Sequence, residues 1–462
     1  MKKMFLALLA LLLVAVTAVT FVACSKEEGE AGGKQTNGEP TYVSKFKSGK
    51  GFQEIKDPVS WEKINSYPIK KAGMPIEEAR QLCVNFLRYA KTACWIPNDS
   101  YDIWSDAKIH NDGTPPARSL TGGDIYGGLP YIGYATGSIY RLMDYIDEET
   151  GVVNMATAGD VPLAFGNQCA NGAYVGFARV INSADYGVTS EMNLAHNFLK
   201  VGDYAYQEYI PNWSEGYNTT MVRDENGADK MYECYAQMKA GDGIVYWTTA
   251  GHVVMIASDP IVERTADGKI DPMKSSVTVI DQAVKFVPYQ HENGDLAQIA
   301  QNVDAKWTFQ QLYNGKYLPF TFEEWTGTDE IEITECGLAL KTGTVYAKGT
   351  IEEENRTFKN EASAPATIKM DDIFNLVATS NYFIMDLYAE FRNADGIEVY
   401  KLASRPIKAA GLTKFQFYKA GDNFECWGSA DNIHAGEEYT VKIYMQLATG
   451  ERPVLWEGKL EH

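Results

Sequence analysis

The chain has 462 residues, of which 45% are hydrophobic and nine are tryptophan, so it can build a large folded core. Its formal net charge at pH 7 is −19, and an acidic surface repels phosphate backbones, which argues against nucleic acid as a partner. Its seven cysteines include no Cys-x-x-Cys pair, so the spacing does not favour a zinc site, and disulfides are permitted without being required.

The N-terminus carries the pattern of an export signal. Two lysines precede an apolar run over residues 5–22, which ends at Ala23-Cys24 and gives way at once to charged residues. A small residue at this boundary marks a processed signal and not a membrane span. The segment Phe21-Val22-Ala23-Cys24 resembles the lipobox of bacterial lipoproteins, which implies cleavage after residue 23 and acylation of Cys24 as a stable membrane anchor. The alternative is an ordinary secretory signal followed by an incidental cysteine.

Residues 24–42 follow the signal and are rich in Gly, Glu, Lys and Asn, with almost no apolar side chains. Such a segment cannot pack, so we expect a flexible tether. Within it, Lys26-Glu27-Glu28 resembles the short signal that directs some Bacteroidota lipoproteins to the cell surface, although a charged tether would look similar after any lipobox. The expected location is therefore the cell envelope, lipid-anchored and outside the cytoplasm, with the cell surface as the further implication of this motif.

Residues 75–95 carry the spacing of an amphipathic helix. Pro75 suits the first helical position, and the two acidic residues that follow suit the positive end of the helix dipole. Apolar residues recur at helical intervals and include Cys83 and Cys94. We expect both cysteines on the buried stripe of this helix, as structural residues.

Residues 241–287 change to short β-rich runs separated by turns. The pattern predicts strands at Gly243–Trp247, His252–Ala257 and Val277–Asp281. The stretch Trp307–Phe322 is expected to close the same domain.

From residue 328 onward the pattern is mostly β, and several strands at short spacing predict an Ig-like β-sandwich. The sequence therefore predicts an α+β chain divided into a signal peptide (1–23), a tether (24–42), a first domain (43–327) and a β-sandwich (328–462). The segments of this last domain that we expect to form strands, with a hairpin turn at Asn393–Gly396, are Thr344–Ile351, Phe383–Phe391, Ile397–Lys401, Phe415–Lys419 and Tyr439–Gln446.

Four motifs that can carry chemistry occur in order along the first domain. A glycine-flanked loop contains Tyr131, Cys169 begins a helical stretch that runs to about Ile181, a Gly-Asp-Gly turn at 241–243 leads into a strand, and His252 opens the next strand. A cysteine at a helix N-terminus has a lowered pKa, because the dipole favours the thiolate. A histidine facing it can accept the thiol proton and later donate it to a leaving amine.

The imidazole of His252 needs a partner on its other nitrogen to fix its tautomer and direction. Asp281 and Gln282 end a later strand and point to opposite faces, because side chains alternate along a strand. Only one can serve, and we expect Asp281 for its charge, with Gln282 as the alternative. Tyr131 is placed to direct its hydroxyl toward a developing oxyanion.

This order of parts resembles the papain-like cell-wall hydrolases of the NlpC type and, more loosely, their CHAP relatives, over about residues 75–325. The resemblance implies a papain-like fold that hydrolyses amide bonds in peptidoglycan stem peptides without a metal or other cofactor. It further implies Cys169 as nucleophile, His252 as base, Asp281 as the residue that orients the histidine, and Tyr131 as the family's loop tyrosine.

The chain departs from the family's usual pattern in two respects. The family has Asp-Cys-Ser-Gly where this sequence has Gln168-Cys169-Ala170-Asn171. The intervals between the motifs are also longer than in compact members, which implies insertions near the cleft at about 139–165 and 185–232.

Two other classes of function stay open. One is a cysteine peptidase on the same scaffold that acts on host or dietary protein. The other is a non-catalytic surface lipoprotein, in which a degenerate papain-like fold and the sandwich bind glycan or protein, and Cys169 and His252 are ordinary buried residues. The aromatic segment 204–213 is either a substrate platform or lid, or a half-buried strand that packs on the core.

Overall fold

The computed structural model describes residues 53–68, 74–102, 119–132, 137–155, 166–181, 198–205, 218–248, 251–322, 325–326, 335–351, 357–404, 412–417, 424–447 and 451–461. The predicted signal peptide, the tether and Cys24 lie outside the described residues, as does most of the aromatic segment 204–213. No described helix combines the length and the apolar character needed to span a membrane.

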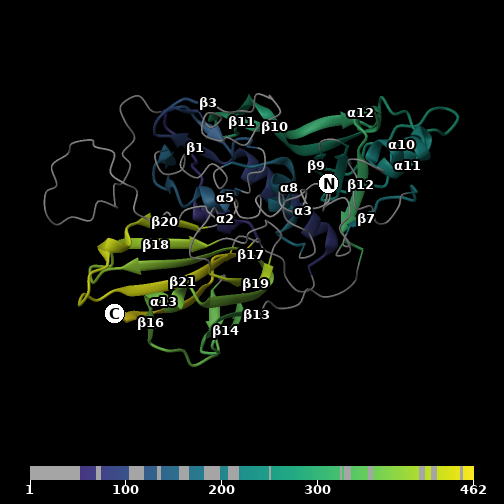
Figure 1. Ribbon diagram of the computed structural model, residues 1–462. Coiled ribbons are helices and arrows are strands. Elements are labelled where there is room, and N and C mark those ends of the chain that lie inside the picture. The colour runs from purple at the N-terminus through teal and green to yellow at the C-terminus, as the bar shows by residue number, and fades with distance from the viewer. Residues whose placement is uncertain are drawn as a thin grey trace, which may run out of the picture.

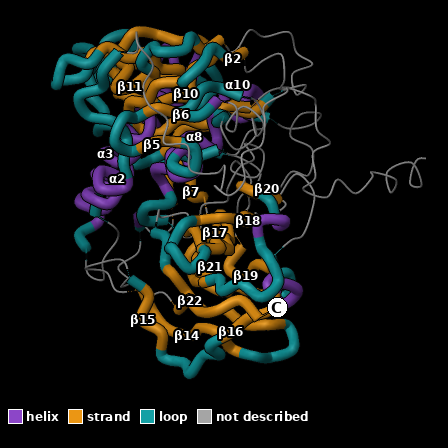
Figure 2. Tube along the Cα trace, turned by 90° about the vertical axis from the view of Figure 1, so that its left-hand side faces the viewer, coloured by secondary structure: helices purple, strands orange, loops and turns teal. Residues whose placement is uncertain are grey.

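The fold is α+β, as the sequence predicts at this level, and it consists mostly of strands. Two large sheets lie one above the other in both views (Figures 1 and 2), and most of the helices accompany the first sheet. The described helices are α2 (Trp61–Ser66), α3 (Ile76–Thr92), α5 (Ile139–Leu142), α8 (Cys169–Phe177), α10 (Thr219–Asn226), α11 (Ala228–Tyr235), α12 (Phe309–Asn314), α13 (Met370–Ile373) and the 3₁₀ helix η2 (Ala430–Asn432).

The first sheet has the strand order β5-β6-β1-β4-β11-β10-β9-β8-β12-β7. Its neighbours are antiparallel except for the pairs β1–β6 and β4–β11. Its strands, with the separate pair β2 (Tyr101–Asp102) and β3 (Ser119–Leu120), are β1 (Cys94–Pro97), β4 (Tyr126–Gly127), β5 (Ile146–Asp147), β6 (Val152–Val153), β7 (Phe198–Lys200), β8 (Gly243–Trp247), β9 (Gly251–Ile256), β10 (Ser276–Gln290), β11 (Leu296–Thr308) and β12 (Leu318–Phe322).

The strands predicted at Gly243–Trp247, His252–Ala257 and Val277–Asp281 are confirmed as β8, β9 and the first part of β10. The stretch Trp307–Phe322 contains the end of β11, α12 and β12. Because β8, β9 and β10 are consecutive neighbours inside the sheet, residues far apart in sequence come to lie side by side on adjacent strands.

Helix α3 confirms most of the helix predicted over 75–95, but the predicted C-terminal end is wrong. The helix stops at Thr92, and Ala93 turns to an extended ψ of 122°. Cys94 then opens β1 and pairs with Gly127 of β4. Cys94 is buried, as is Cys83, but as a strand residue. An apolar run of this length fits a helix or a buried strand equally well, and pairing with β4 decided between them.

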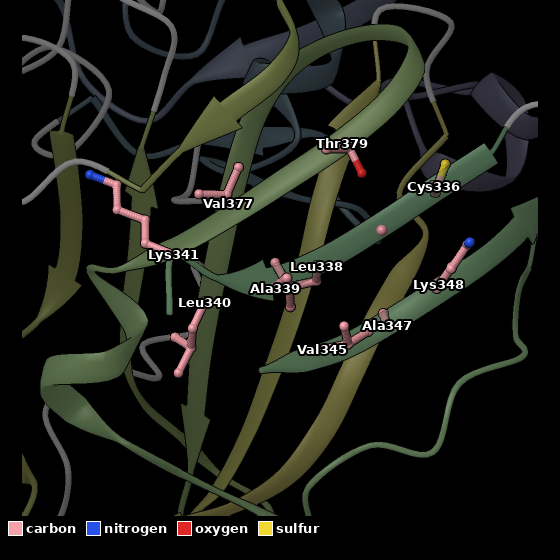
Figure 3. A pocket seen from close by; sticks show the side chains of 11 residues that line it. Cys336, Leu338, Ala339, Leu340, Lys341, Val345, Ala347, Lys348, Val377 and Thr379 are labelled. Atoms are coloured by element: carbon pink, nitrogen blue, oxygen red, sulfur yellow. The ribbon is translucent and has the colours of Figure 1, made fainter. Parts of the chain in front are cut away.

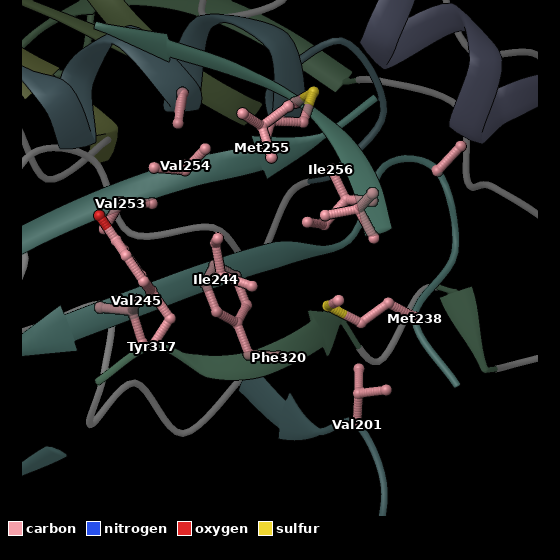
Figure 4. Packing of buried hydrophobic residues seen from close by; sticks show 14 of the residues in the cluster. Val201, Met238, Ile244, Val245, Val253, Val254, Met255, Ile256, Tyr317 and Phe320 are labelled. Atoms are coloured by element: carbon pink, nitrogen blue, oxygen red, sulfur yellow. The ribbon is translucent and has the colours of Figure 1, made fainter. Parts of the chain in front are cut away.

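Helix α8 packs between α3 and the sheet. A Cβ on Gly176 would lie 2.7 Å from both Leu87 Cβ on α3 and Met255 Cε on β9, so this position requires a residue without a side chain. Met255 belongs to the apolar core that Val253, Val254 and Ile256 of β9 share with β8 and β12 (Figure 4). Burial of this face fixes the distance of α8 from β9.

The second sheet is built from residues after the first one ends, and the strands predicted there are confirmed with shifted ends. Its longest strand, β17 (Leu376–Arg392), pairs with four others, β13, β18, β19 and β21. The hairpin turn at Asn393–Gly396 joins β17 to β18, with Gly396 at φ 77°. The remaining strands are β13 (Glu335–Leu340), β14 (Val345–Ile351), β15 (Phe358–Asn360), β16 (Thr367–Lys369), β18 (Glu398–Ser404), β19 (Leu412–Gln416), β20 (Phe424–Gly428), β21 (Thr440–Leu447) and β22 (Val454–Glu461).

A hollow of about 540 Å³ lies over β13, β14 and β17 of the second sheet (Figure 3). Apolar side chains such as Leu338, Val345 and Val377 line most of it, together with Lys341 and Lys348. None of its lining residues belongs to the first sheet.

Buried ion pairs join the two sheets. Arg141, at the end of α5, pairs with Asp386 of β17 at 2.9 Å. Asp144, just beyond α5, accepts from Lys401 and Arg452, each at 3.2 Å, and from the Tyr388 hydroxyl at 2.8 Å. Arg141 and Asp144 lie within residues 139–165, so this segment binds the second sheet.

Candidate active site

Cys169 is the first residue of α8. Gln168 before it is extended (φ −105°, ψ 173°) and gives the helix no side-chain cap, so the backbone N–H groups of the first turn are free of intrahelical partners there. Cys169 is 6% exposed, and its thiol lies 3.8 Å from the carbonyl oxygen of Gly251, at the start of β9. The sulfur therefore lies between the positive N-terminal end of α8 and the first residue of β9.

His252 is the second residue of β9, and its ring faces this sulfur. The imidazole is within electrostatic reach of the Cys169 thiol, and its Nε2 lies 2.6 Å from Asp281 Oδ1 on the neighbouring strand β10. The structure thus brings Cys169, His252 and Asp281 together in one chain of contacts.

The three groups favour a charged pair over a neutral one. Burial opposes ionisation of Cys169, but the charge and hydrogen bond of His252 outweigh it, so the pKa of the thiol falls below its ordinary value. Burial likewise opposes the imidazolium, and Asp281 and Cys169 together raise the pKa of His252 well above its usual range. Both shifts favour the thiolate–imidazolium form of the site over the neutral form.

Of the two candidates for the third position, the structure brings Asp281 to His252. Its second oxygen accepts from Asn302 Nδ2 at 3.1 Å, across the β10–β11 pair. Gln282 points to the opposite face, where its Nε2 donates to the carbonyl oxygens of Ala300 and Leu129 at 3.1 and 3.3 Å. The strand alternation that separated these two residues in the sequence also separates them here.

Tyr131 lies beside the chain that enters α8. It forms a parallel bridge with Asn167, two residues before the cysteine, and the bridge is held by bonds from Ile132 N to Asn167 O and from Asn167 N to Pro130 O, both 3.0 Å. The backbone of the loop is thereby fixed next to the residues that lead into Cys169. The role of its half-buried side chain toward an oxyanion stays a prediction.

Sequence reasoning missed the aromatic wall beside the histidine. The rings of Tyr246 and Tyr317 lie 6.2 and 6.3 Å from the His252 ring, centroid to centroid, and Trp307 packs on Tyr317 at 5.6 Å. They cover the imidazole, whose side chain is 19% exposed. The place of Tyr246 beside the histidine could be predicted, because it lies opposite His252 in the β8–β9 pair. Nothing local in the sequence indicates Tyr317.

Sequence reasoning also missed Lys91, whose amine is buried beneath the first turn of α8 and donates to Gln282 Oε1. Burial lowers its pKa to about 7, against the opposing influence of Asp281 and Cys169. A signal was present: Lys91 stands four residues after Leu87 and so falls on the apolar stripe of the helix.

A second cysteine–histidine pair occurs elsewhere on the same sheet. Cys94 Sγ lies 3.2 Å from His291 Nε2. Burial raises the pKa of Cys94 to about 12 and lowers the pKa of His291, so both groups are neutral. In this pair proximity alone does not produce a thiolate.

Among the residues that the structure describes, no three His, Cys, Asp or Glu side chains gather as metal ligands. All six described cysteines are free thiols. No protein-family model, curated protein or solved structure matches this chain.

Proposed function

We propose that this chain is an envelope-anchored cysteine hydrolase that cleaves peptide or amide bonds, with peptidoglycan stem peptides as its substrates. The observation that carries the proposal is the contact chain from Cys169 through His252 to Asp281 at the N-terminus of α8, with 2.6 Å between the imidazole and the carboxylate. A lipid on Cys24 holds the enzyme at a membrane, outside the cytoplasm, and Lys26-Glu27-Glu28 favours the cell surface.

The proposal includes a papain-like fold for the first sheet and its helices, and an Ig-like sandwich for the second. Support for the first is the order of parts: a cysteine heads a helix that packs on α3, and strands β8, β9 and β10 then follow with the histidine on the middle strand. Support for the second is its largely antiparallel set of short strands around the long β17. The buried pairs at α5 support a fixed position of the second sheet relative to the first.

In the proposed reaction, the Cys169 thiolate attacks the carbonyl carbon of the scissile amide, and the carbonyl electrons move to its oxygen. The N–H groups at the start of α8, which lack intrahelical partners, and the Tyr131 hydroxyl are the proposed donors to that oxyanion. The imidazolium of His252 gives its proton to the leaving nitrogen, the C–N bond breaks, and an acyl-enzyme remains. Water then gives a proton to His252 and attacks the acyl carbon, the C–S bond breaks, and the acid product leaves the restored thiolate.

Digestion of purified peptidoglycan tests the reaction and its substrate class. We expect the wild-type protein to release fragments whose masses account for one added water per cleavage, and Cys169→Ala to release none. Cleavage of unrelated unfolded protein at a comparable rate would replace the wall substrate with a general peptidase. If neither substrate is cut, the non-catalytic lipoprotein is the better description.

Alkylation tests the activated thiolate without any assumption about substrate. We expect iodoacetamide to modify Cys169 near neutral pH, and His252→Ala to abolish that selectivity. Modification of the wild-type Cys169 that begins only near pH 8.5, as for an ordinary cysteine, would contradict the proposed nucleophile.

A further inference from the structure

Lys91 occupies an unusual position for a lysine. It lies in the last turn of α3 and is 4% exposed. Its Nζ contacts Gln282 Oε1, and a Cβ on Gly172 would collide with that same Nζ. Gly172 lies in the first turn of α8, three residues after Cys169. Its missing side chain leaves space for the Lys91 amine and not for a residue of the sheet.

The surroundings of this amine leave it poorly paired. An ammonium has three donors, and in the described part of the chain Lys91 has Gln282 Oε1 as its one hydrogen-bond acceptor and forms no ion pair. Asn167 Oδ1, which also faces the position of the missing Gly172 side chain, is buried without a hydrogen-bond partner there. Burying such groups without full pairing is costly, so packing alone gives no reason for a lysine at this position.

The negative groups that act on Lys91 are Asp281 and Cys169. In the reactive form of the site the thiolate and the carboxylate carry two negative charges, and the imidazolium of His252 carries one positive charge. An ammonium beneath the helix, which is the form of Lys91 below its pKa of about 7, brings this buried group to neutrality and favours the ionised sulfur. Through Gln282, the residue next to Asp281, it also contacts the strand that supports His252.

We propose that Lys91 is a positioning residue for the hydrolase: its ammonium, seated under the first turn of α8 in the space left by Gly172, balances the charge of the site and keeps Cys169 ionised. This inference rests on the proposed function and adds a fourth charged group, which nothing in the motif order indicates.

The test is the pH dependence of Cys169 alkylation in the full chain, followed with iodoacetamide and located by peptide mass spectrometry. We expect Lys91→Met to move the midpoint of the profile upward by about one pH unit or more relative to wild type. Lys91→Gln, which keeps a hydrogen-bond donor without the charge, is expected to move it by a similar amount. Arg88→Met removes a positive charge from the exposed face of the same helix and is expected to leave the midpoint unchanged, because solvent screens it.

Thermal unfolding of each variant separates this role from a purely structural one. Replacing a buried charge with an apolar side chain of similar size is often neutral or stabilising, so we expect Lys91→Met to melt at or above the wild-type temperature. An unchanged alkylation midpoint in a folded Lys91→Met or Lys91→Gln protein overturns the inference and leaves the hydrolase intact. Loss of the fold in both variants assigns Lys91 a structural role and also overturns it. An ordinary midpoint for the wild-type Cys169 removes the proposed hydrolase itself.

Discussion

The thiol of Cys94 lies 3.2 Å from the imidazole of His291, and burial favours the neutral form of both groups. Burial raises the pKa of Cys94 to about 12 and lowers the pKa of His291. Cys169 has the same kind of neighbour but also stands at a helix N-terminus, and its histidine is held by a carboxylate 2.6 Å away. The Cys94–His291 pair is therefore a control, within the same chain, for the proposed activation of Cys169.

The first prediction uses this control. At pH 7 we expect iodoacetamide to modify Cys169 and to leave Cys94 unmodified, because His252 lowers the pKa of Cys169 and burial raises the pKa of Cys94 to about 12. His291→Ala is expected to leave the alkylation rate of Cys169 unchanged, in contrast to His252→Ala. Quantitative peptide mass spectrometry gives both rates. Equal modification of the two cysteines would mean that exposure, and not the charged neighbours, governs reactivity.

A second prediction concerns Asp281 and pH. The thiolate–imidazolium pair exists above the pKa of Cys169, which is lowered, and below the pKa of His252, which is raised. Asp281→Asn removes a group that raises the pKa of His252, so the alkaline limb of the pH–rate profile should move to lower pH. We also expect kcat/KM to fall about 100-fold or more, as for loss of general acid–base catalysis.

The matched variant for Asp281→Asn is Asn302→Ala. It keeps the carboxylate and removes one hydrogen bond to it, 3.1 Å long. A loss of about tenfold is expected, since a hydrogen bond to a charged group contributes about 1.5 kcal/mol. If Asp281→Asn reduced the rate no more than Asn302→Ala and left the alkaline limb in place, the carboxylate would have no role in the charge state of His252.

A third prediction concerns the junction of the two sheets. Burial opposes ionisation of Asp144, but Lys401 and Arg452 outweigh it and lower its pKa to about 2. An unfolded aspartate has a pKa of about 3.9, so the stabilisation from Asp144 is complete above about pH 4 and is lost as the pH falls toward 2. Asp144→Asn should therefore lower the free energy of unfolding at pH 7 by about 3–5 kcal/mol, since it leaves two buried cations unpaired.

Urea unfolding at pH 7 and at about pH 3 measures this effect. The wild-type protein should lose part of its stability between the two values, and Asp144→Asn should lose less. Asp224→Asn is the control, because Asp224 pairs with Arg223 at the surface with its side chain 57% exposed, and such pairs contribute little. Equal stability of wild type and Asp144→Asn at pH 7 would show that the junction does not depend on this cluster.

The sequence by itself determined the features that depend on residues close together in the chain. The hydrophobic period predicted the body of α3, the β-rich runs predicted β8 and β9, and the Asn393–Gly396 turn predicted the β17–β18 hairpin. Strand alternation predicted that Asp281 and Gln282 face opposite sides. These features follow from local backbone sterics and turn chemistry, which are the same wherever a segment lies in a fold.

Only the tertiary structure decided how those segments meet. It placed Asp281 rather than Gln282 against His252, and it put the amine of Lys91 under the helix that Cys169 begins. It also placed Cys94 in a strand, where the sequence predicted a helix. Each of these outcomes depends on partners more than 25 residues away in the chain. Such contacts depend on the burial of apolar surface over the whole core and on the pairing of the charges buried with it. A local sequence pattern therefore cannot predict them.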